Sequence, residues 1–219
     1  MPTEKPLAVA ETFASIQGET SFAGWPAFFI RLAGCNLRCR WCDARYTHEE
    51  PAARLTAVAQ LLDEVYAQPW RLVVITGGEP LLQPAVLPLL AALGEAGCTV
   101  LLETNGSLAI AAVPAPVVRI VDVKCPGSGM AGSFLLANLR ALRPQDEVKL
   151  VLADHADYQW ARDFIRRHHL WTRATVLLSP VADTLPPGLL GDWILADGLP
   201  VRLQVQLHRL LWPERLRGA

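Results

Sequence analysis

The sequence predicts an α/β fold whose mainly parallel sheet forms a partial β/α barrel. Short apolar segments alternate with amphipathic ones along most of the 219 residues, which is the pattern of successive βαβ units. The seven or eight strand candidates suit an incomplete barrel better than a full (β/α)8 barrel of roughly 250 residues. Four polar motifs fall at the ends of predicted strands, where parallel α/β folds place their chemistry. We therefore expect one shared site at that edge of the sheet.

The first half of the chain contains five predicted strands and two predicted helices. Residues 8–13 could form a short strand, and the aromatic and branched segment 27–32 (AFFIRL) gives a stronger strand signal. Apolar residues recur at helical spacing in 56–66, where Thr56 is a possible N-cap. The fully apolar run 72–75 (LVVI) is typical of a buried strand. The other segments predicted in this half are a helix at 84–95 and strands at 99–102 and 117–121.

The second half continues the alternation. The predicted helices are 133–142, 158–168 and 187–195, and the predicted strands are 148–152, 175–178 and 201–207. The last strand (VRLQVQL) alternates apolar and polar residues, which suits an edge strand with one wetter face. The tail 209–219 is basic and is expected to be a solvated end. Because no fixed repeat or low-complexity linker interrupts the chain, we expect residues 1–219 to form a single domain.

The composition restricts the function classes. Hydrophobic residues make up 52% of the chain and charged residues 19%, which is enough apolar material for a sizeable core. The net charge is −1, without the basic excess of a nucleic-acid-binding domain. No run approaches the roughly 20 apolar residues of a transmembrane helix, and the segment MPTEKPLAVAETF lacks the apolar region of a signal peptide. We therefore expect a cytoplasmic protein without nucleic-acid or membrane partners.

Three of the five cysteines are grouped with the spacing C-x3-C-x2-C. Cys35, Cys39 and Cys42 could hold three irons of a [4Fe–4S] cluster and leave the fourth iron open to an external molecule, because a full ferredoxin-type site needs four thiolates. The alternative is a zinc site with His48 as the fourth ligand. Zinc sites often use two separated cysteine pairs, and the sequence has no second pair. The odd, grouped cysteines also argue against a disulfide framework.

Four further motifs each allow a functional and a structural interpretation. In TGGEP (76–80), adjacent glycines let a ligand approach the backbone and the carboxylate can accept from an amine, or the segment is a tight turn. ETNGS (103–107) offers a carboxylate and an amide, or a plain Asn-Gly turn. The lysine of DVKCPGSG (122–129) could meet a carboxylate or ribose hydroxyls, or lie in a surface loop. SIQGE (15–19) offers paired donors and acceptors for a flat ligand, or forms a polar loop.

Together these motifs resemble the radical S-adenosylmethionine (SAM) superfamily, in which C-x3-C-x2-C is followed by GGEP after the next strand. Within it, the chain resembles the 7-carboxy-7-deazaguanine synthase family of 7-deazapurine (queuosine) biosynthesis. The resemblance spans nearly the whole chain and is carried by residues 13–19, 29–36, 39–43, 76–80, 103–106, 122–130 and 204–208. It implies the partial TIM-like barrel of radical SAM enzymes.

The resemblance also implies an activity. A [4Fe–4S] cluster and SAM would generate a 5′-deoxyadenosyl radical, which takes a hydrogen from 6-carboxy-5,6,7,8-tetrahydropterin. The ring contracts, ammonia leaves and 7-carboxy-7-deazaguanine forms, which makes the enzyme a carbon–nitrogen lyase. The implied partners are the small pterin substrate, a flavodoxin or ferredoxin as electron donor and a second copy in a homodimer. Mg²⁺ is a further implied cofactor.

The resemblance assigns roles to individual residues. Cys35, Cys39 and Cys42 bind the cluster. SAM is contacted by Trp41, Asp43, Gly78, Glu79, Asp122, Val123, Lys124 and Ser179. Substrate is contacted by Ile16, Gln17, Gly18, Arg31 and Thr76. The physical chemistry agrees, since the Arg31 guanidinium can bind a carboxylate bidentately and Gln17 offers a donor and an acceptor to the pterin edge.

The chain departs from the family pattern in two places. The family often binds Mg²⁺ with a Thr or Ser hydroxyl just after the Cys-Asp step, and this chain has Ala44 there. Direct side-chain ligation of Mg²⁺ from this position is therefore lost, which leaves the dependence on Mg²⁺ open. Either the substrate carboxylate relies more on Arg31, or substrate and water hold the ion. The chain also continues for eleven residues after His208, so that Gln206 and His208 are additional candidates for the site.

Two other functions fit the cysteine spacing. One is an activating enzyme for a glycyl-radical protein, which shares C-x3-C-x2-C but must admit a polypeptide. SIQGE, the closing segment 206–208 and the lack of an added docking segment favour a small substrate instead. The other is a non-enzymatic iron–sulfur or zinc-binding protein, which would leave the polar motifs at the other strand ends unexplained.

Overall fold

A curved nine-stranded sheet organises the computed structural model, which describes residues 5–48, 53–215 and 217–218. The strand order is β3-β1-β2-β4-β5-β6-β7-β8-β9. The strands are β1 (Leu7–Ile16), β2 (Pro26–Leu32), β3 (Arg54–Thr56), β4 (Leu72–Gly77), β5 (Thr99–Thr104), β6 (Val118–Asp122), β7 (Glu147–Leu152), β8 (Thr175–Pro180) and β9 (Arg202–Leu203). Residues 1–4 of the N-terminal segment and residues 216 and 219 of the basic tail lie outside the described residues.

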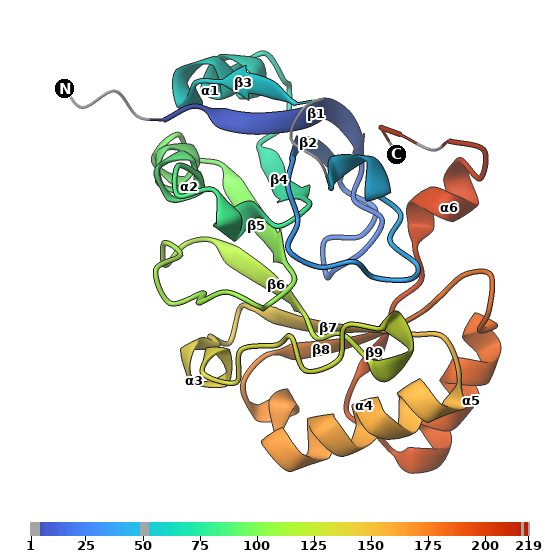
Figure 1. Ribbon diagram of the computed structural model, residues 1–219. Coiled ribbons are helices and arrows are strands. Elements are labelled where there is room, and N and C mark those ends of the chain that lie inside the picture. The colour runs from blue at the N-terminus through green and yellow to red at the C-terminus, as the bar shows by residue number, and fades with distance from the viewer. Residues whose placement is uncertain (1–4, 49–52, 216, 219) are drawn as a thin grey trace.

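The sheet is parallel from β2 onward and remains open. Each neighbouring pair from β2–β4 to β8–β9 is parallel, whereas β1 runs antiparallel to both β2 and β3. The two edges, β3 and β9, do not pair with each other. Figure 1 shows the strands turning from β1 at the top of the view to β7–β9 at the bottom. The prediction of a partial barrel is confirmed, and the carboxyl ends of the parallel strands share one edge.

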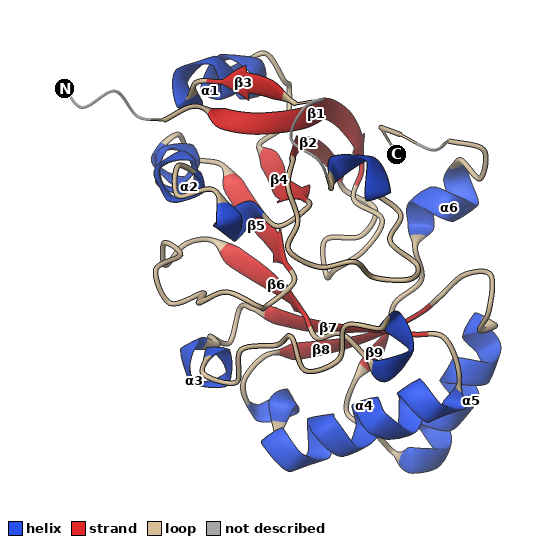
Figure 2. Cartoon of the chain, in the orientation of Figure 1, coloured by secondary structure: helices blue, strands red, loops and turns tan. Residues whose placement is uncertain are grey.

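Helices follow most of the parallel strands. They are α1 (Val58–Tyr66), α2 (Val86–Glu95), α3 (Asn138–Ala141), α4 (His155–His168), α5 (Pro187–Asp197) and α6 (Leu207–Leu211). Figure 2 shows α2, α3, α4 and α5 along the outer side of the curved sheet, whereas α6 lies apart from them near the C-terminus. No helix of the described residues is long and apolar enough to cross a membrane.

The central strands are apolar throughout because both of their faces are covered. Val73 and Ile75 of β4 pack with Leu89 of α2 in one core cluster. Val74, which lies between them, packs with Leu101 of β5 in a second cluster. Successive side chains of a strand point to opposite faces, so the unbroken run LVVI indicates burial on both sides. This rigid centre holds the strand ends in place.

A separate cluster fixes the far end of the sheet. Tyr158 and Ile165 of α4 pack with Leu150 of β7 and Leu190 of α5. The α4 helix begins where the Asp154 side chain accepts a hydrogen bond from the backbone N–H of Asp157 at 2.9 Å, which satisfies one of the free amides of the first turn. Its last turn is basic, and this complements the helix dipole.

Some of the secondary structure predicted from the sequence was wrong. The helix expected at 133–142 is reduced to α3, because the backbone N–H of Leu135 donates to the Gly106 carbonyl at 2.9 Å instead of to a helical partner. The strand expected at 201–207 is reduced to β9, and α6 begins at Leu207. The tail is therefore partly helical. Thr56 ends strand β3, which was not predicted, and Ala57 occupies the N-cap of α1.

Candidate active site

The carboxyl ends of five consecutive parallel strands open on one cavity of about 380 Å³. Each strand contributes at least one polar side chain to the lining. These are Arg31 of β2, Thr76 of β4, Glu103 and Thr104 of β5, Asp122 of β6 and Lys149 of β7. Arg31 is paired with Thr76, and Asp122 with Lys149, in the register of the sheet. The motifs therefore meet at one cavity, as the sequence led us to expect.

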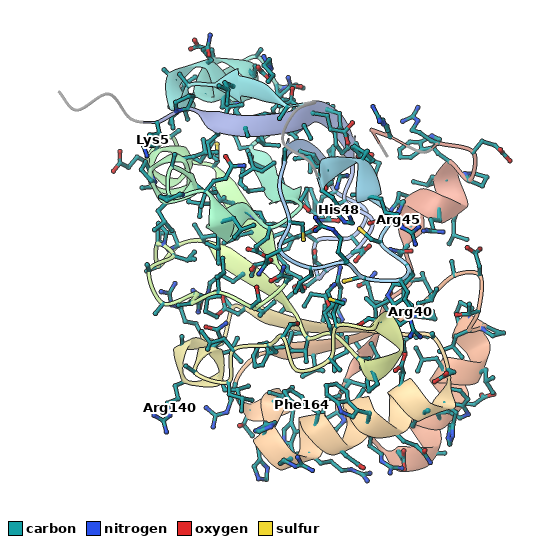
Figure 3. All side chains as sticks on the ribbon, viewed as in Figure 1. Lys5, Arg40, Arg45, His48, Arg140 and Phe164 are labelled. Atoms are coloured by element: carbon teal, nitrogen blue, oxygen red, sulfur yellow. The ribbon has the colours of Figure 1, made fainter. Side chains whose placement is uncertain are left out.

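The cysteine loop covers one side of this cavity. Cys35, Cys39 and Cys42 all line it, and each is partly buried. The backbone N–H of Leu37 lies 3.4 Å from Cys35 Sγ, and His48 Nε2 lies 3.4 Å from Cys42 Sγ. Figure 3 shows His48 in this loop. The loop therefore presents its three thiols to the same space as the strand ends.

The loop is held by main-chain hydrogen bonds at both of its ends. Gly34 N donates to the Thr47 carbonyl at 2.6 Å, which closes the loop on itself. Arg40 N donates to the Ser128 carbonyl at 3.0 Å, which attaches the loop to the DVKCPGSG segment. Because these bonds use backbone atoms, the path of the loop is fixed independently of most of its side chains.

The thiols fit an iron–sulfur cluster by their chemistry. Three soft sulfur donors face one cavity, which is the ligand type that such clusters take. Burial raises the pKa of Cys39 and of Cys42, so that the free thiols are protonated at neutral pH and would have to lose their protons to bind iron. Within the described ranges, no three His, Cys, Asp or Glu side chains form a group that could hold a single metal ion. All five cysteines are free.

The two glycines of TGGEP let the protein's own backbone come close. A Cβ on Gly78 would lie 2.0 Å from the Gly34 carbonyl oxygen and 3.0 Å from Cys35 Cβ. Gly77 has φ of +136°, and its Cβ would lie 2.1 Å from the Leu32 carbonyl oxygen. Only glycine fits such contacts. These residues therefore seat the start of the cysteine loop against the end of β4, and Gly78 also lines the cavity.

Glu79 of TGGEP holds the ETNGS turn in place by hydrogen bonds. It is fully buried and accepts hydrogen bonds from Leu81 N at 3.0 Å, from Thr104 Oγ1 at 2.8 Å and from Asn105 N at 2.7 Å. Burial raises the pKa of this carboxyl, and the three hydrogen bonds partly oppose that effect. Asn105 lines the cavity and donates to Asn36 Oδ1 at 3.0 Å. Glu79 thus positions the ETNGS turn against the cysteine loop.

An ion pair joins opposite walls of the cavity. Lys149 Nζ donates to Glu19 Oε2 at 2.6 Å, and Gln206 Nε2 donates to Glu19 Oε1 at 2.8 Å. Burial alone would raise the pKa of Glu19, but the charge and hydrogen bond of Lys149 lower it to about 2. Glu103 accepts from Thr76 Oγ1 at 2.8 Å, and its burial raises its pKa in spite of the Lys149 charge. The cavity therefore holds carboxylates and a cation together.

Arg31 is oriented by groups behind it. Its Nε donates to Glu11 Oε1 at 2.8 Å, and the same oxygen accepts from the Tyr46 hydroxyl at 2.6 Å. The guanidinium also lies 5.4 Å from the centroid of the Phe13 ring. Burial would lower the pKa of Arg31, but Tyr46, Asp43 and Glu11 raise it, which keeps the group charged. Since only Nε is used by Glu11, the terminal nitrogens remain available to a ligand.

The structure places the predicted site residues in two groups. Those that line the cavity are Cys35, Cys39, Cys42, Trp41, Asp43, Gly78, Asp122, Lys124, Arg31, Thr76 and Gln206. Those that do not line it are Glu79, Val123, Ser179, Ile16, Gln17, Gly18 and His208. Gln17 is buried and its Oε1 accepts from Glu19 N at 3.0 Å, so it shapes the turn that carries Glu19. Ala44 also lines the cavity.

Several lining residues were not predicted. Glu19 and Glu103 belong to motifs that the sequence already singled out, and their carboxylates were the available signal. Lys149 had a signal too, because it is a single cation inside the apolar strand EVKLVL. Arg209 gave none, since its place depends on how α6 docks. Its guanidinium lies 3.9 Å from Asp183 at the rim of the cavity.

Comparison with known proteins agrees with this geometry. Residues 29–116 match the model of the Radical SAM superfamily. The 7-carboxy-7-deazaguanine synthase of Chlorobaculum tepidum is 44% identical over 100% of both chains. The Koribacter versatilis protein of the same name is 43% identical over 97% of this chain and 100% of its own.

Solved structures show the same fold. The crystal structure of QueE from Escherichia coli superposes with a TM-score of 0.77 at 25% identity, covering 93% of this chain and 95% of that one. Streptococcus suis SuiB bound to S-adenosylmethionine has a TM-score of 0.52 at 13% identity, over 82% of this chain and 47% of that one, and shares the fold alone. Because its relatives match it over their full length and three cysteines line its cavity, the chain belongs to the 7-carboxy-7-deazaguanine synthase family of radical SAM enzymes.

Proposed function

We propose that this protein converts 6-carboxy-5,6,7,8-tetrahydropterin to 7-carboxy-7-deazaguanine, with loss of ammonia, in 7-deazapurine biosynthesis. The observation that carries the proposal is the meeting of three thiols with Arg31, Glu103 and Lys149 in one cavity of about 380 Å³. A cavity of this size suits a small molecule and its cofactor, since ligand pockets measure roughly 300–1,000 Å³. The family membership of the full-length chain supports the same reaction.

The cofactor end of the cavity is the cysteine loop. We infer that Cys35, Cys39 and Cys42 hold a [4Fe–4S] cluster, which together with SAM supplies one-electron, hydrogen-abstracting chemistry when bound. The residues proposed to hold SAM are Trp41, Asp43, Gly78, Glu79, Asp122, Val123, Lys124 and Ser179. Lys124 Nζ donates to Asp122 Oδ2 at 2.7 Å, which orders two of these side chains. Glu79 acts from its buried position by fixing the neighbouring turn.

The substrate end is the group of charged residues across the cavity. Arg31 is proposed to bind the substrate carboxylate through its terminal nitrogens, since paired N–H···O bonds fix both position and orientation. The carboxylates of Glu19 and Glu103 offer acceptors for the N–H groups of a pterin edge. Thr76 adds a hydroxyl beside Glu103. Ile16, Gln17 and Gly18 contribute through the turn that carries Glu19.

Magnesium is proposed to bind without a side-chain oxygen at position 44. Ala44 lines the cavity, and its side chain has no oxygen that could ligate a cation. Mg²⁺ commonly keeps several waters and is held partly by its substrate. An ion in this site would therefore bind to the substrate carboxylate and water, and Arg31 would balance more of the carboxylate's negative charge.

The finer features of the enzyme's partners are proposals as well. The reaction needs one electron from outside, for which we propose a reduced flavodoxin or ferredoxin. We also propose a homodimer and a cytoplasmic location. The five cysteines are free, and three of them are proposed to bind iron, which is consistent with a reducing compartment.

The test is an anaerobic assay of the reconstituted protein. The protein is loaded with iron and sulfide, mixed with SAM, dithionite and 6-carboxytetrahydropterin, and the products are followed by mass spectrometry with and without Mg²⁺. A deazaguanine product formed with release of one ammonia supports the proposal. Formation of 5′-deoxyadenosine from an untouched pterin would reject the substrate assignment and leave the radical SAM family intact.

A further inference from the structure

Three exposed arginines alternate with the cysteines of the loop. Arg38, Arg40 and Arg45 are exposed, and none of them lines the cavity. None of the ion pairs formed within the described ranges includes any of the three. The nearest acid in the loop, Asp43, is also exposed, but it lines the cavity and forms none of these ion pairs. The outer side of the cysteine loop therefore carries unneutralised positive charge, and we call these three arginines the basic loop.

The protein's own backbone holds the basic loop in order. Arg38 Nη1 donates to the carbonyls of Cys35 at 2.7 Å and Leu37 at 2.9 Å, and Arg45 donates to the Arg40 carbonyl. These contacts use neutral acceptors, so that the charges are positioned without being cancelled. Figure 3 labels Arg40 and Arg45 on the same side of the molecule, with Arg45 beside His48 and Arg40 lower in the view.

This local charge contrasts with the rest of the chain. The whole sequence has a net charge of −1, so the basic loop is not part of a generally basic surface. The loop also surrounds the atoms that must receive an electron, because its three thiols are the proposed cluster ligands. Since SAM and substrate occupy the cavity, an external donor has to approach the thiols from the outer side. The position of the basic loop beside the thiols and its positive charge together indicate which kind of partner binds there.

We propose that Arg38, Arg40 and Arg45 form the docking surface for an acidic one-electron carrier protein. The inference rests on the proposed function and deepens it by naming where the reductant binds. Complementary charge speeds encounter and fixes orientation more than it adds affinity, and the effect weakens with salt because the Debye length is about 8 Å at physiological ionic strength. Docking here brings the carrier's redox group next to the loop that holds the iron.

The test compares two reductants on the holoenzyme. Arg40→Glu, Arg45→Glu and their double variant are assayed with reduced flavodoxin at low and physiological salt, and with dithionite plus methyl viologen. Arg140→Glu on α3 and Arg167→Glu on α4 are matched controls, since both are exposed and Figure 3 places Arg140 on the other side of the molecule. The dissociation constant of oxidised flavodoxin, measured by calorimetry, supplies a readout that does not depend on turnover.

We expect the double variant to lower kcat/KM for flavodoxin by about tenfold or more at low salt, to weaken its binding similarly and to flatten the salt dependence. Turnover with methyl viologen, the iron content and both control variants should stay unchanged, and Arg40→Lys should retain most activity. Unchanged flavodoxin kinetics and binding would overturn the inference, as would an equal loss with both reductants. If the unsubstituted protein fails to convert the pterin with methyl viologen, the proposed function fails, while SAM cleavage and calorimetry still test the docking surface.

Discussion

At the scale of single residues, Lys149 decides the charge state of the cavity. It contacts Glu19 directly, and its positive charge also acts on Glu103 and Asp122. Both partners of the pair are largely buried, with 13% and 12% of their side chains exposed. Removing the lysine would leave a carboxylate without its counter-charge in a poorly solvated place, which costs more than the loss of an exposed pair.

Lys149→Met is therefore expected to lower the free energy of unfolding at pH 7 by about 1–3 kcal/mol, while Lys149→Arg should cost less. The pKa of Glu19 in the folded protein is about 2, below its ordinary value of 4.5, so the pair stabilises the fold above pH 4.5. That contribution is lost as the pH falls toward 2. Urea titrations at several pH values should show the difference between variant and wild type shrinking below about pH 4.5. A difference independent of pH would contradict the charge argument.

Arg31 gives a prediction for turnover. Arg31→Lys keeps the positive charge but removes the fork that binds a carboxylate through two N–H groups. A charge-assisted hydrogen bond contributes about 1.5–3 kcal/mol, which corresponds to a loss of about ten- to a hundredfold in kcat/KM for the pterin. Reductive cleavage of SAM, followed as 5′-deoxyadenosine, should remain near the wild-type level. Arg54→Lys, at the exposed ion pair with Glu64, is the matched control and should leave both activities unchanged.

At the scale of elements, the approach of α6 to the turn after β1 depends on one glycine. Leu207 N donates to the Gly18 carbonyl at 2.9 Å, and a Cβ on Gly18 would lie 2.7 Å from His208 Nδ1 and 2.9 Å from its backbone nitrogen. Gln206, which holds Glu19, directly precedes α6. The helix therefore carries one wall of the cavity, and its position is set by a contact that only glycine allows.

Gly18→Ala is expected to displace α6 at a cost of about 1–3 kcal/mol. Hydrogen exchange at the Leu207 amide should become at least about fivefold faster, and KM for the pterin should rise because Glu19 loses the Gln206 contact. The control is Gly94→Ala in α2, where the new methyl group meets nothing within 4 Å. Since alanine is the better helix former, that variant should gain about 0.5–1 kcal/mol. Equal exchange rates in Gly18→Ala and wild type would reject the docking role.

The elements that the sequence predicts well are those whose stability is local or fully buried. β4 and α2 lie close to their predicted ranges, because LVVI is apolar on both faces and the buried residues of α2 recur at helical spacing. β3 could not be predicted, since its three residues become a strand only by pairing with β1, as in Leu7 with Thr56. α6 was also missed, because its five residues depend on a partner that lies far away in the sequence.

The candidate site also has one part that the sequence predicts and another part that it does not. The cysteine loop and the strand-end motifs could be predicted because their residues are adjacent in the sequence and chemically distinctive. The tie between Glu19, Lys149 and Gln206 could not, since 130 residues separate Glu19 from Lys149 and 187 separate it from Gln206. Such a contact exists only after the sheet has curved, and no local sequence pattern predicts that curvature.

At the scale of the whole molecule, one sheet runs through separate core clusters. One cluster packs around β4 and α2, and another around β7, α4 and α5, while β5 and β6 connect them without a break in the ladder. We therefore propose that residues 1–219 behave as one domain. Core clusters on one continuous sheet should unfold together, because the loss of one exposes strands that the others cover.

Urea unfolding should accordingly follow a single transition. The midpoints measured by tryptophan fluorescence and by far-ultraviolet circular dichroism should coincide, as expected of a two-state protein. Trp160 and Trp193 pack against the cluster of β7, α4 and α5, so that fluorescence reports on this cluster, whereas circular dichroism reports on the whole chain. Two separated midpoints would contradict the single-domain proposal and would indicate that the halves fold independently.

The order in which the cavity's walls occur along the chain has a consequence during synthesis. Cys42 is made early, whereas Gln206 and Arg209 come near the end of the sequence. At about 5–20 residues per second, a ribosome needs on the order of ten seconds or more to pass from the first of these to the last. Throughout that interval, the thiols belong to a nascent chain whose cover has not yet been translated. Slower translation of the second half lengthens the time during which oxygen reaches them, so the yield of iron-loaded protein depends on translation rate as well as on iron supply.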